Sequence, residues 1–146
     1  MTLTPAPVAD YAGDLSPTQA WSLLQDEADA LLIDVRTDAE WSYVGGPNLA
    51  TLTKHVLQLS WQIFPQMQVA PDFVEQLCAH AISPTQSLLF LCRSGVRSRH
   101  AAAAMTQAGY LRCYNISQGF EGDKDSNGQR GNIGGWKVDG LDWMQP

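Results

Sequence analysis

The sequence predicts an α/β fold organised around a mainly parallel β-sheet. Residues 30–35 (ALLIDV) and 87–91 (SLLFL) form two short, almost wholly apolar runs, which are typical of strands buried on both faces of a parallel sheet. Segments with helix signals alternate with these runs, and this alternation is typical of layered α/β proteins. The length of 146 residues fits one domain over residues 1–146.

Capping boxes predict the helices of the first half. Residues 16–19 (SPTQ) provide a serine N-cap, a proline in the first turn and a glutamine at the third helical position, so a helix begins there. Thr37 and Glu40 have the same three-residue spacing as Ser16 and Gln19 and form a second capping-box pattern. We therefore expect a short helix directly after the first apolar strand.

The remaining elements follow from periodicity and from helix breakers. Residues 55–61 alternate apolar and polar side chains, which predicts a half-buried strand at a sheet edge. Residues 71–81 read as an amphipathic helix, and the alanine-rich residues 98–108 read as a helix that ends at Gly109. Residues 113–117 (CYNIS) predict a further strand.

A polar segment over about residues 122–135 carries no such signal. It is rich in glycine, aspartate and asparagine and is longer than an ordinary connection. We therefore expect an insertion that is either mobile or functional.

Composition limits the kinds of function. Apolar residues make up 45% of the chain and charged residues 16%, which favours a folded domain over disorder. The net charge of −6 disfavours nucleic acids and anionic membranes as partners. No apolar run is long enough for a membrane span, and the first residues lack a signal-peptide pattern; we therefore expect a soluble, cytoplasmic protein.

The cysteine pattern points to reduced thiols. Cys78, Cys92 and Cys113 are an odd set with long separations, which fits neither a disulfide framework nor a zinc ribbon. The spacing therefore predicts no metal site. Cys78 is expected to pack in the core on its helix, and Cys113 to be structural or, as an alternative, a resolving thiol.

Cys92 is the candidate nucleophile because of where it lies. The apolar strand 87–91 delivers it to the carboxyl edge of the sheet, where ligands bind in open α/β folds. The residues that follow are Arg93, Ser94, Gly95, Val96, Arg97 and Ser98, and then a helix. A loop that curls back on the sulfur, the start of a helix and two arginines would together favour thiolate over thiol.

This arrangement resembles the active-site loop of the rhodanese family of sulfurtransferases. The segment LLIDVRT (residues 31–37) with Glu40 is similar to the family's D-V-R segment, and residues 108–110 and 115–120 (NISQGF) are similar to the stretch after its catalytic helix. The resemblance covers about ninety residues from Leu31 to Phe120, and the tail motifs GW and G-L-x-W also fit. The chain departs from the family at residues 44–49 and in the insertion 122–135.

The resemblance implies a fold, an activity and roles for residues. The fold is a three-layer α/β structure with a mainly parallel central sheet of about five strands flanked by helices. The activity is transfer of a sulfane sulfur, without a cofactor, from a small sulfur-containing anion such as thiosulfate, or from a persulfide, to a thiol or cyanide through a persulfide on Cys92. Arg93 and Arg97 would pair with the donor's oxygens, and the amides of residues 93–98 would stabilise the terminal sulfur.

Asp34 and Arg36 lie at the carboxyl end of the first strand, and we expect a supporting role for them. Their place at the strand end suggests ion pairs that hold neighbouring loops, with Glu40 as the suggested partner of Arg36.

Two alternatives remain open at this stage. Four residues separate Cys92 from Arg97, whereas phosphatases of this fold hold one more. The resemblance implies that the tighter ring suits a sulfur atom bonded to the cysteine better than a phosphate. A phosphatase is therefore the second enzyme hypothesis. A non-catalytic rhodanese-like binding or sensor module is the third, although such modules commonly lose the cysteine that this chain retains.

Overall fold

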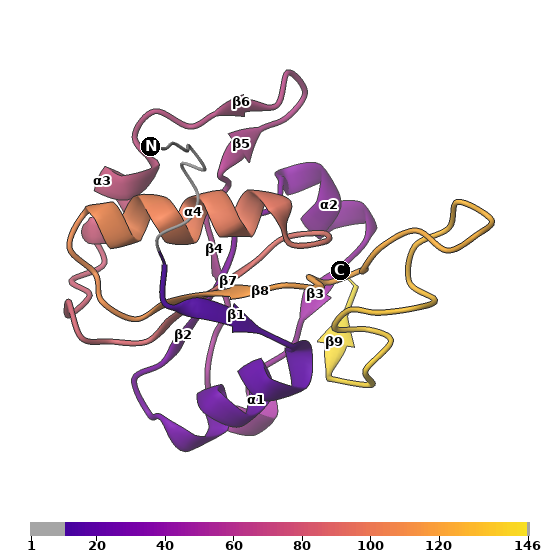
Figure 1. The fold of residues 1–146 in the computed structure, drawn as a ribbon, viewed down its shortest axis with the longest axis horizontal. Helices are drawn as coiled ribbons and strands as arrows, with labels where there is room; N and C mark the ends of the chain where they lie inside the picture. The colour runs from indigo at the N-terminus through magenta and orange to yellow at the C-terminus, as the bar shows by residue number, and fades with distance from the viewer. Residues whose placement is uncertain (1–10, 146) are drawn as a thin grey trace, which may run out of the picture.

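The computed structural model describes residues 11–145 and confirms the predicted fold class (Figure 1). The central sheet has five strands, and every neighbouring pair in it is parallel. In spatial order the strands are β1 (Gly13–Leu15), β8 (Cys113–Ile116), β7 (Leu88–Leu91), β2 (Leu31–Asp34) and β4 (Leu57–Gln58). Strand β1 was not predicted, because three residues that begin with glycine carry no strand pattern.

Helices cover both faces of the sheet, which gives three layers. Figure 1 shows α1 (Pro17–Asp26) on one side and α3 (Phe73–Cys78) and α4 (Val96–Gln107) on the other. Successive strand residues point to opposite faces: Leu32 and Leu89 pack in the cluster with α1, and Ile33 and Phe90 pack in the cluster with α3 and α4. The two apolar runs are therefore buried on both faces, as their composition predicts.

Local signals place several elements as expected. Both capping boxes form, at Ser16 for α1 and at Thr37 for α2 (Asp38–Tyr43). The strand predicted over residues 55–61 lies at the sheet edge but shortens to β4. The helix expected from residue 98 begins two residues earlier, because Gly95 adopts a left-handed conformation and caps it.

Short pairings that involve the middle and the end of the chain were not predicted. Strands β5 (Gln62–Ile63) and β6 (Gln68–Val69) form an antiparallel hairpin, and β3 (Gly46–Pro47) pairs with β9 (Trp143–Met144). A short 3₁₀ helix, Ala50–Leu52, lies between β3 and β4. Among residues 11–145, no helix combines the length and the apolar character that a membrane crossing requires.

The insertion over residues 122–135 extends away from the sheet as a series of turns (Figure 1). Asp125 organises it, because its carboxylate accepts hydrogen bonds from the amides of Asn127 and Gln129 and from the side chain of Asn132. Arg130 donates to the carbonyl oxygen of Gly122 and links the two sides of the insertion. Polar contacts within the segment, together with hydrogen bonds to Glu121 and Gln118 at its base, therefore hold the insertion.

Candidate active site

Cys92 lies at the point where the sheet topology changes direction. It directly follows β7, and Asp34 ends the neighbouring strand β2. The chain continues from β2 to β4 on one side and from β7 to β8 on the other. Crevices at such switch points, beyond the carboxyl ends of parallel strands, are the usual ligand sites of open α/β sheets.

A tight turn aims a backbone amide at the sulfur. Gly95 has φ 109°, and its N–H donates to Sγ of Cys92 at 3.1 Å. A Cβ at this position would overlap the carbonyl oxygen of Ser117, so the turn depends on glycine for both its conformation and its close approach to β8. Helix α4 begins at the next residue and directs the positive end of its dipole toward the same turn.

The segment after β8 braces the loop from behind. Phe120 and Glu121 donate backbone hydrogen bonds to the carbonyl oxygens of Cys92 at 2.8 Å and of Arg93 at 2.9 Å. Gly119 has φ 64° and lies against these same two carbonyls, where a side chain would collide. The NISQGF segment noted in the sequence therefore holds the cysteine loop in place.

A chain of side-chain hydrogen bonds leads from the thiol to the sheet edge. Sγ of Cys92 lies 3.2 Å from Oγ of Ser98, which donates to Oδ1 of Asn115 at 2.5 Å. Nδ2 of Asn115 donates to Asp14 at 3.1 Å. A carboxylate only accepts hydrogen bonds, so Asp14 requires the NH₂ group of Asn115 to point toward it. Oδ1 of Asn115 then points toward Ser98 and accepts the Ser98 hydroxyl proton.

This polarity gives the sulfur two opposite hydrogen-bond environments. The amide of Gly95 donates to the sulfur, whereas Ser98 presents an oxygen lone pair that accepts from a thiol. No sequence motif assigns a role to Asn115 or Asp14. The available signal was a polar asparagine within the apolar strand CYNI.

Arg97 is paired with Glu40 in a fork geometry. Nη1 and Nη2 of Arg97 lie 2.6 and 3.0 Å from the two carboxylate oxygens of Glu40, which α2 delivers. Burial alone raises the pKa of Glu40, but the hydrogen bond and charge of Arg97 outweigh it and hold this pKa below its ordinary value. Burial opposes the charge of Arg97 as well, and Glu40 still raises the pKa of Arg97.

Arg36 pairs with Asp34, so the suggested Arg36–Glu40 pair is wrong. Both side chains are fully buried, with Nη2–Oδ2 and Nε–Oδ1 distances of 2.7 and 2.9 Å. Arg36 also donates to the carbonyl oxygen of Gly45 at 2.7 Å and lies 4.5 Å from the ring centre of Phe120. The pair thus connects the end of β2, the turn after α2 and the bracing segment. Their supporting role stays a prediction.

The cysteine opens into a cavity of about 340 Å³. Five residues of the predicted loop region line it, namely Cys92, Arg93, Ser94, Val96 and Arg97, together with Glu40. Gly95 and Ser98 are buried behind this wall and contact the sulfur from there. Gln62 and Met67 of the β5–β6 hairpin complete the lining, and no motif in this uncharged stretch of sequence signals their place in the site.

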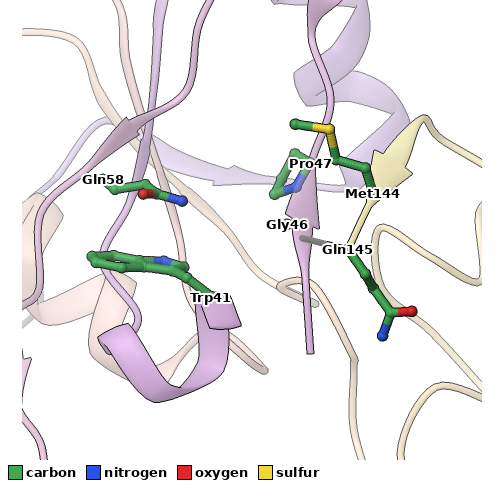
Figure 2. Close-up of a pocket in the computed structure, with 6 residues that line it drawn as sticks. All are labelled: Trp41, Gly46, Pro47, Gln58, Met144 and Gln145. Carbon is green, nitrogen blue, oxygen red and sulfur yellow. The ribbon is translucent and has the colours of Figure 1, made fainter. Parts of the chain in front are cut away.

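A second cavity, of about 170 Å³, adjoins α2 and contains none of the loop residues (Figure 2). Trp41 and Gln58 form one side, and Pro47 and Met144 face them from β3 and β9 (Figure 2). Its walls carry no charged side chain, so of these two cavities the one at Cys92 is equipped for anion and sulfur chemistry.

Solved structures and curated relatives agree with this architecture. The crystal structure of Rv0390 from M. tuberculosis superposes with a TM-score of 0.86 at 42% identity and covers 94% of this chain and 100% of that one. The solution structure of the polysulfide-sulfur transferase homodimer from Wolinella succinogenes has a TM-score of 0.59 at 23% identity, over 96% of this chain and 82% of that one, and shows the fold alone.

Among sequence relatives, an uncharacterized protein of Rickettsia conorii is 39% identical over 131 residues, which is 90% of this chain and 96% of that protein. The thiosulfate sulfurtransferase GlpE of Glaesserella parasuis is 28% identical over 109 residues, which is 75% of this chain and 83% of that protein. Fold and relatives thus define a rhodanese-like α/β domain. The family model of the STR4 middle domain matches residues 12–146, and the chain belongs to this family.

Proposed function

We propose that this protein is a sulfurtransferase that moves a sulfane sulfur from thiosulfate or a persulfide donor to a thiol or cyanide acceptor through a Cys92 persulfide. The observation that carries the proposal is the position of Cys92: its sulfur lies at a topological switch point, accepts the Gly95 amide and faces the start of a 12-residue helix. The names of the distant relatives, thiosulfate sulfurtransferase and polysulfide-sulfur transferase, support the same class of reaction.

The reaction consists of two displacements. The Cys92 thiolate attacks the outer sulfur of thiosulfate; the Sγ–S bond forms as the donor S–S bond breaks, and sulfite leaves with the bonding pair. A thiolate or cyanide then attacks the terminal sulfur of the persulfide, and Cys92 leaves as a thiolate. Both steps balance without an external oxidant or reductant, so the proposal requires no cofactor.

Each residue of the loop has a part in these steps. The Gly95 amide donates to the sulfur and so stabilises the negative charge that it carries, and Ser94 lines the cavity beside it. Arg93 and Arg97 lie at the mouth, where an anionic donor enters. In the first turn of α4, the side chain of Val96 is exposed and the side chain of Ser98 is buried beside the sulfur.

The test measures thiocyanate formation from cyanide with thiosulfate or an organic persulfide as donor, against the uncatalysed rate. We expect catalysis with at least one of these donors and its loss in Cys92→Ser. Hydrolysis of 4-nitrophenyl phosphate faster than sulfur transfer would instead favour a phosphatase. Inertness toward every sulfane donor would favour a binding or sensor module.

A further inference from the structure

The cavity at Cys92 holds less net positive charge than its two arginines suggest. Arg97 is fully engaged by Glu40, since both of its terminal nitrogens lie within 3.0 Å of the carboxylate. Arg93 is exposed and forms no ion pair within residues 11–145. With Cys92 as a thiolate, the formal charges of the cavity walls cancel: Arg93 and Arg97 against Cys92 and Glu40.

This balance affects anionic donors unequally. Thiosulfate brings two negative charges into the cavity, whereas an ionised organic persulfide brings one. Charge interactions are strong in such partly buried sites. An arginine whose two terminal nitrogens already bind a carboxylate can form only weak additional hydrogen bonds and little additional charge attraction with a sulfonate group. The second charge of thiosulfate is therefore poorly compensated while Glu40 occupies Arg97.

The other charged groups near the site do not restore the balance. Arg36 is neutralised by Asp34 at 2.7 Å behind the loop. Asp14 reaches the sulfur only through Asn115 and Ser98, and it adds negative rather than positive charge on that side.

The remaining wall suits an uncharged organic group. Residues 56–71 contain no charged side chain, and Gln62 and Met67 from this stretch line the cavity together with the cysteine. Ile63 and Phe64 continue the hairpin with 52% and 57% of their surface exposed. Val96, which is 55% exposed, extends the apolar rim on the other side of the mouth.

We infer that Glu40 is a specificity-determining residue that, by neutralising Arg97, makes this site select organic persulfides over thiosulfate as sulfur donors. The inference rests on the proposed function and names its donor class. In the step it describes, the Cys92 thiolate attacks the outer sulfur of R–S–S⁻. The Sγ–S bond forms, the donor S–S bond breaks, and R–S⁻ leaves with the bonding pair, so that charge and electrons balance.

The experiment compares thiosulfate with benzyl persulfide, an apolar donor of one charge, by following the second-order rate constant of Cys92 persulfidation with intact mass spectrometry. In the native protein we expect the rate constant for benzyl persulfide to exceed that for thiosulfate by about tenfold or more. In Glu40→Gln we expect the thiosulfate value to rise by about tenfold and the benzyl persulfide value to change by less than about threefold. Glutamine preserves the capping box of α2.

Two controls separate this charge effect from others. Asp38→Asn removes an equal charge from the exposed start of the same helix and is expected to leave the donor ratio unchanged. Adding Arg97→Gln to Glu40→Gln should abolish the gain with thiosulfate, because the freed guanidinium is then missing.

The possible results bear differently on the two proposals. Equal rate constants for the two donors in the native protein, or no gain with thiosulfate in Glu40→Gln, would overturn the donor preference and leave sulfur transfer standing. Failure of both donors to modify Cys92 would overturn the proposed function, and the donor preference with it.

Discussion

The hydroxyl of Ser98 lies 3.2 Å from the sulfur of Cys92 but donates its proton to Asn115 at 2.5 Å. The hydroxyl oxygen therefore faces the sulfur as an acceptor. A thiolate at Cys92 already accepts the Gly95 amide and can accept a further hydrogen bond from Ser98 only if the Ser98 hydroxyl rotates. Asp14 disfavours this rotation because it holds the Asn115 amide with its oxygen toward Ser98.

Removing the acceptor at Asp14 is expected to make Cys92 react faster with an alkylating reagent at a fixed pH. In Asp14→Ala the Asn115 amide is free to reverse, its NH₂ group can donate to Ser98, and the Ser98 proton can donate to the sulfur. One such hydrogen bond to the thiolate corresponds to a gain of about two- to tenfold in the rate of alkylation at a fixed pH. The measurement is the rate of iodoacetamide labelling at Cys92 at pH 7.

The matched control places Asp14→Ala in a Ser98→Ala background. If the effect passes through the hydrogen bonds, the gain in rate disappears there. An unchanged gain in that background would show that Asp14 acts by its charge alone, and the hydrogen-bond relay would be refuted.

Gly95→Ala is expected to damage the site and lower the free energy of unfolding by more than about 1 kcal/mol. The position combines a left-handed φ of 109° with a close approach to the carbonyl of Ser117. Gly109→Ala is the matched comparison, since Gly109 has φ 104° but open space around a Cβ. Urea unfolding measures both; equal losses would mean that the contact with Ser117 contributes nothing.

The two other cysteines should differ sharply in reactivity. Burial raises the pKa of Cys113 to about 11, so native protein at pH 8 should not be alkylated there. Cys78 is exposed and should be labelled readily, which peptide mapping by mass spectrometry can check. Labelling of native Cys113 at the same rate as Cys78 would contradict the structure.

Acid should remove the contribution of the Glu40–Arg97 pair to stability. The pKa of Glu40 in the folded protein lies below its ordinary value of 4.5, so the native state favours the ionised form. The stabilisation is present above pH 4.5 and is lost as the pH falls through the lower folded value. Urea unfolding from pH 7 downward should therefore show native protein and Glu40→Gln converging in stability; a constant difference would count against the pair.

The elements whose signals are local were predictable from the sequence. The capping box at Thr37 and the apolar run before Cys92 depend on neighbours along the chain, and both elements lie where the sequence places them. The helix with Cys78 shows the limit of such reasoning. Phe73 and Leu77 are four residues apart and share its buried face, whereas Cys78 falls beyond that face and is exposed.

The contacts that define the site chemistry depend on tertiary structure. Asn115 meets Asp14 because β8 pairs with β1, across 101 residues of sequence. Glu40 lies near Arg36 in the sequence, which suggested that pairing, but the switch point brings Arg97 to it across 57 residues. The pairing of β5 with β6 likewise follows no charge or turn motif and becomes visible only in the fold.

The persulfide on Cys92 is the intermediate on which this account depends most. Intact mass spectrometry after exposure to a sulfane donor, followed by peptide mapping, detects it directly. We predict a gain of one sulfur atom on the peptide that contains Cys92, its absence in Cys92→Ser, and its removal by cyanide. A protein that gains no sulfur, or gains it at Cys78 instead, would contradict the mechanism.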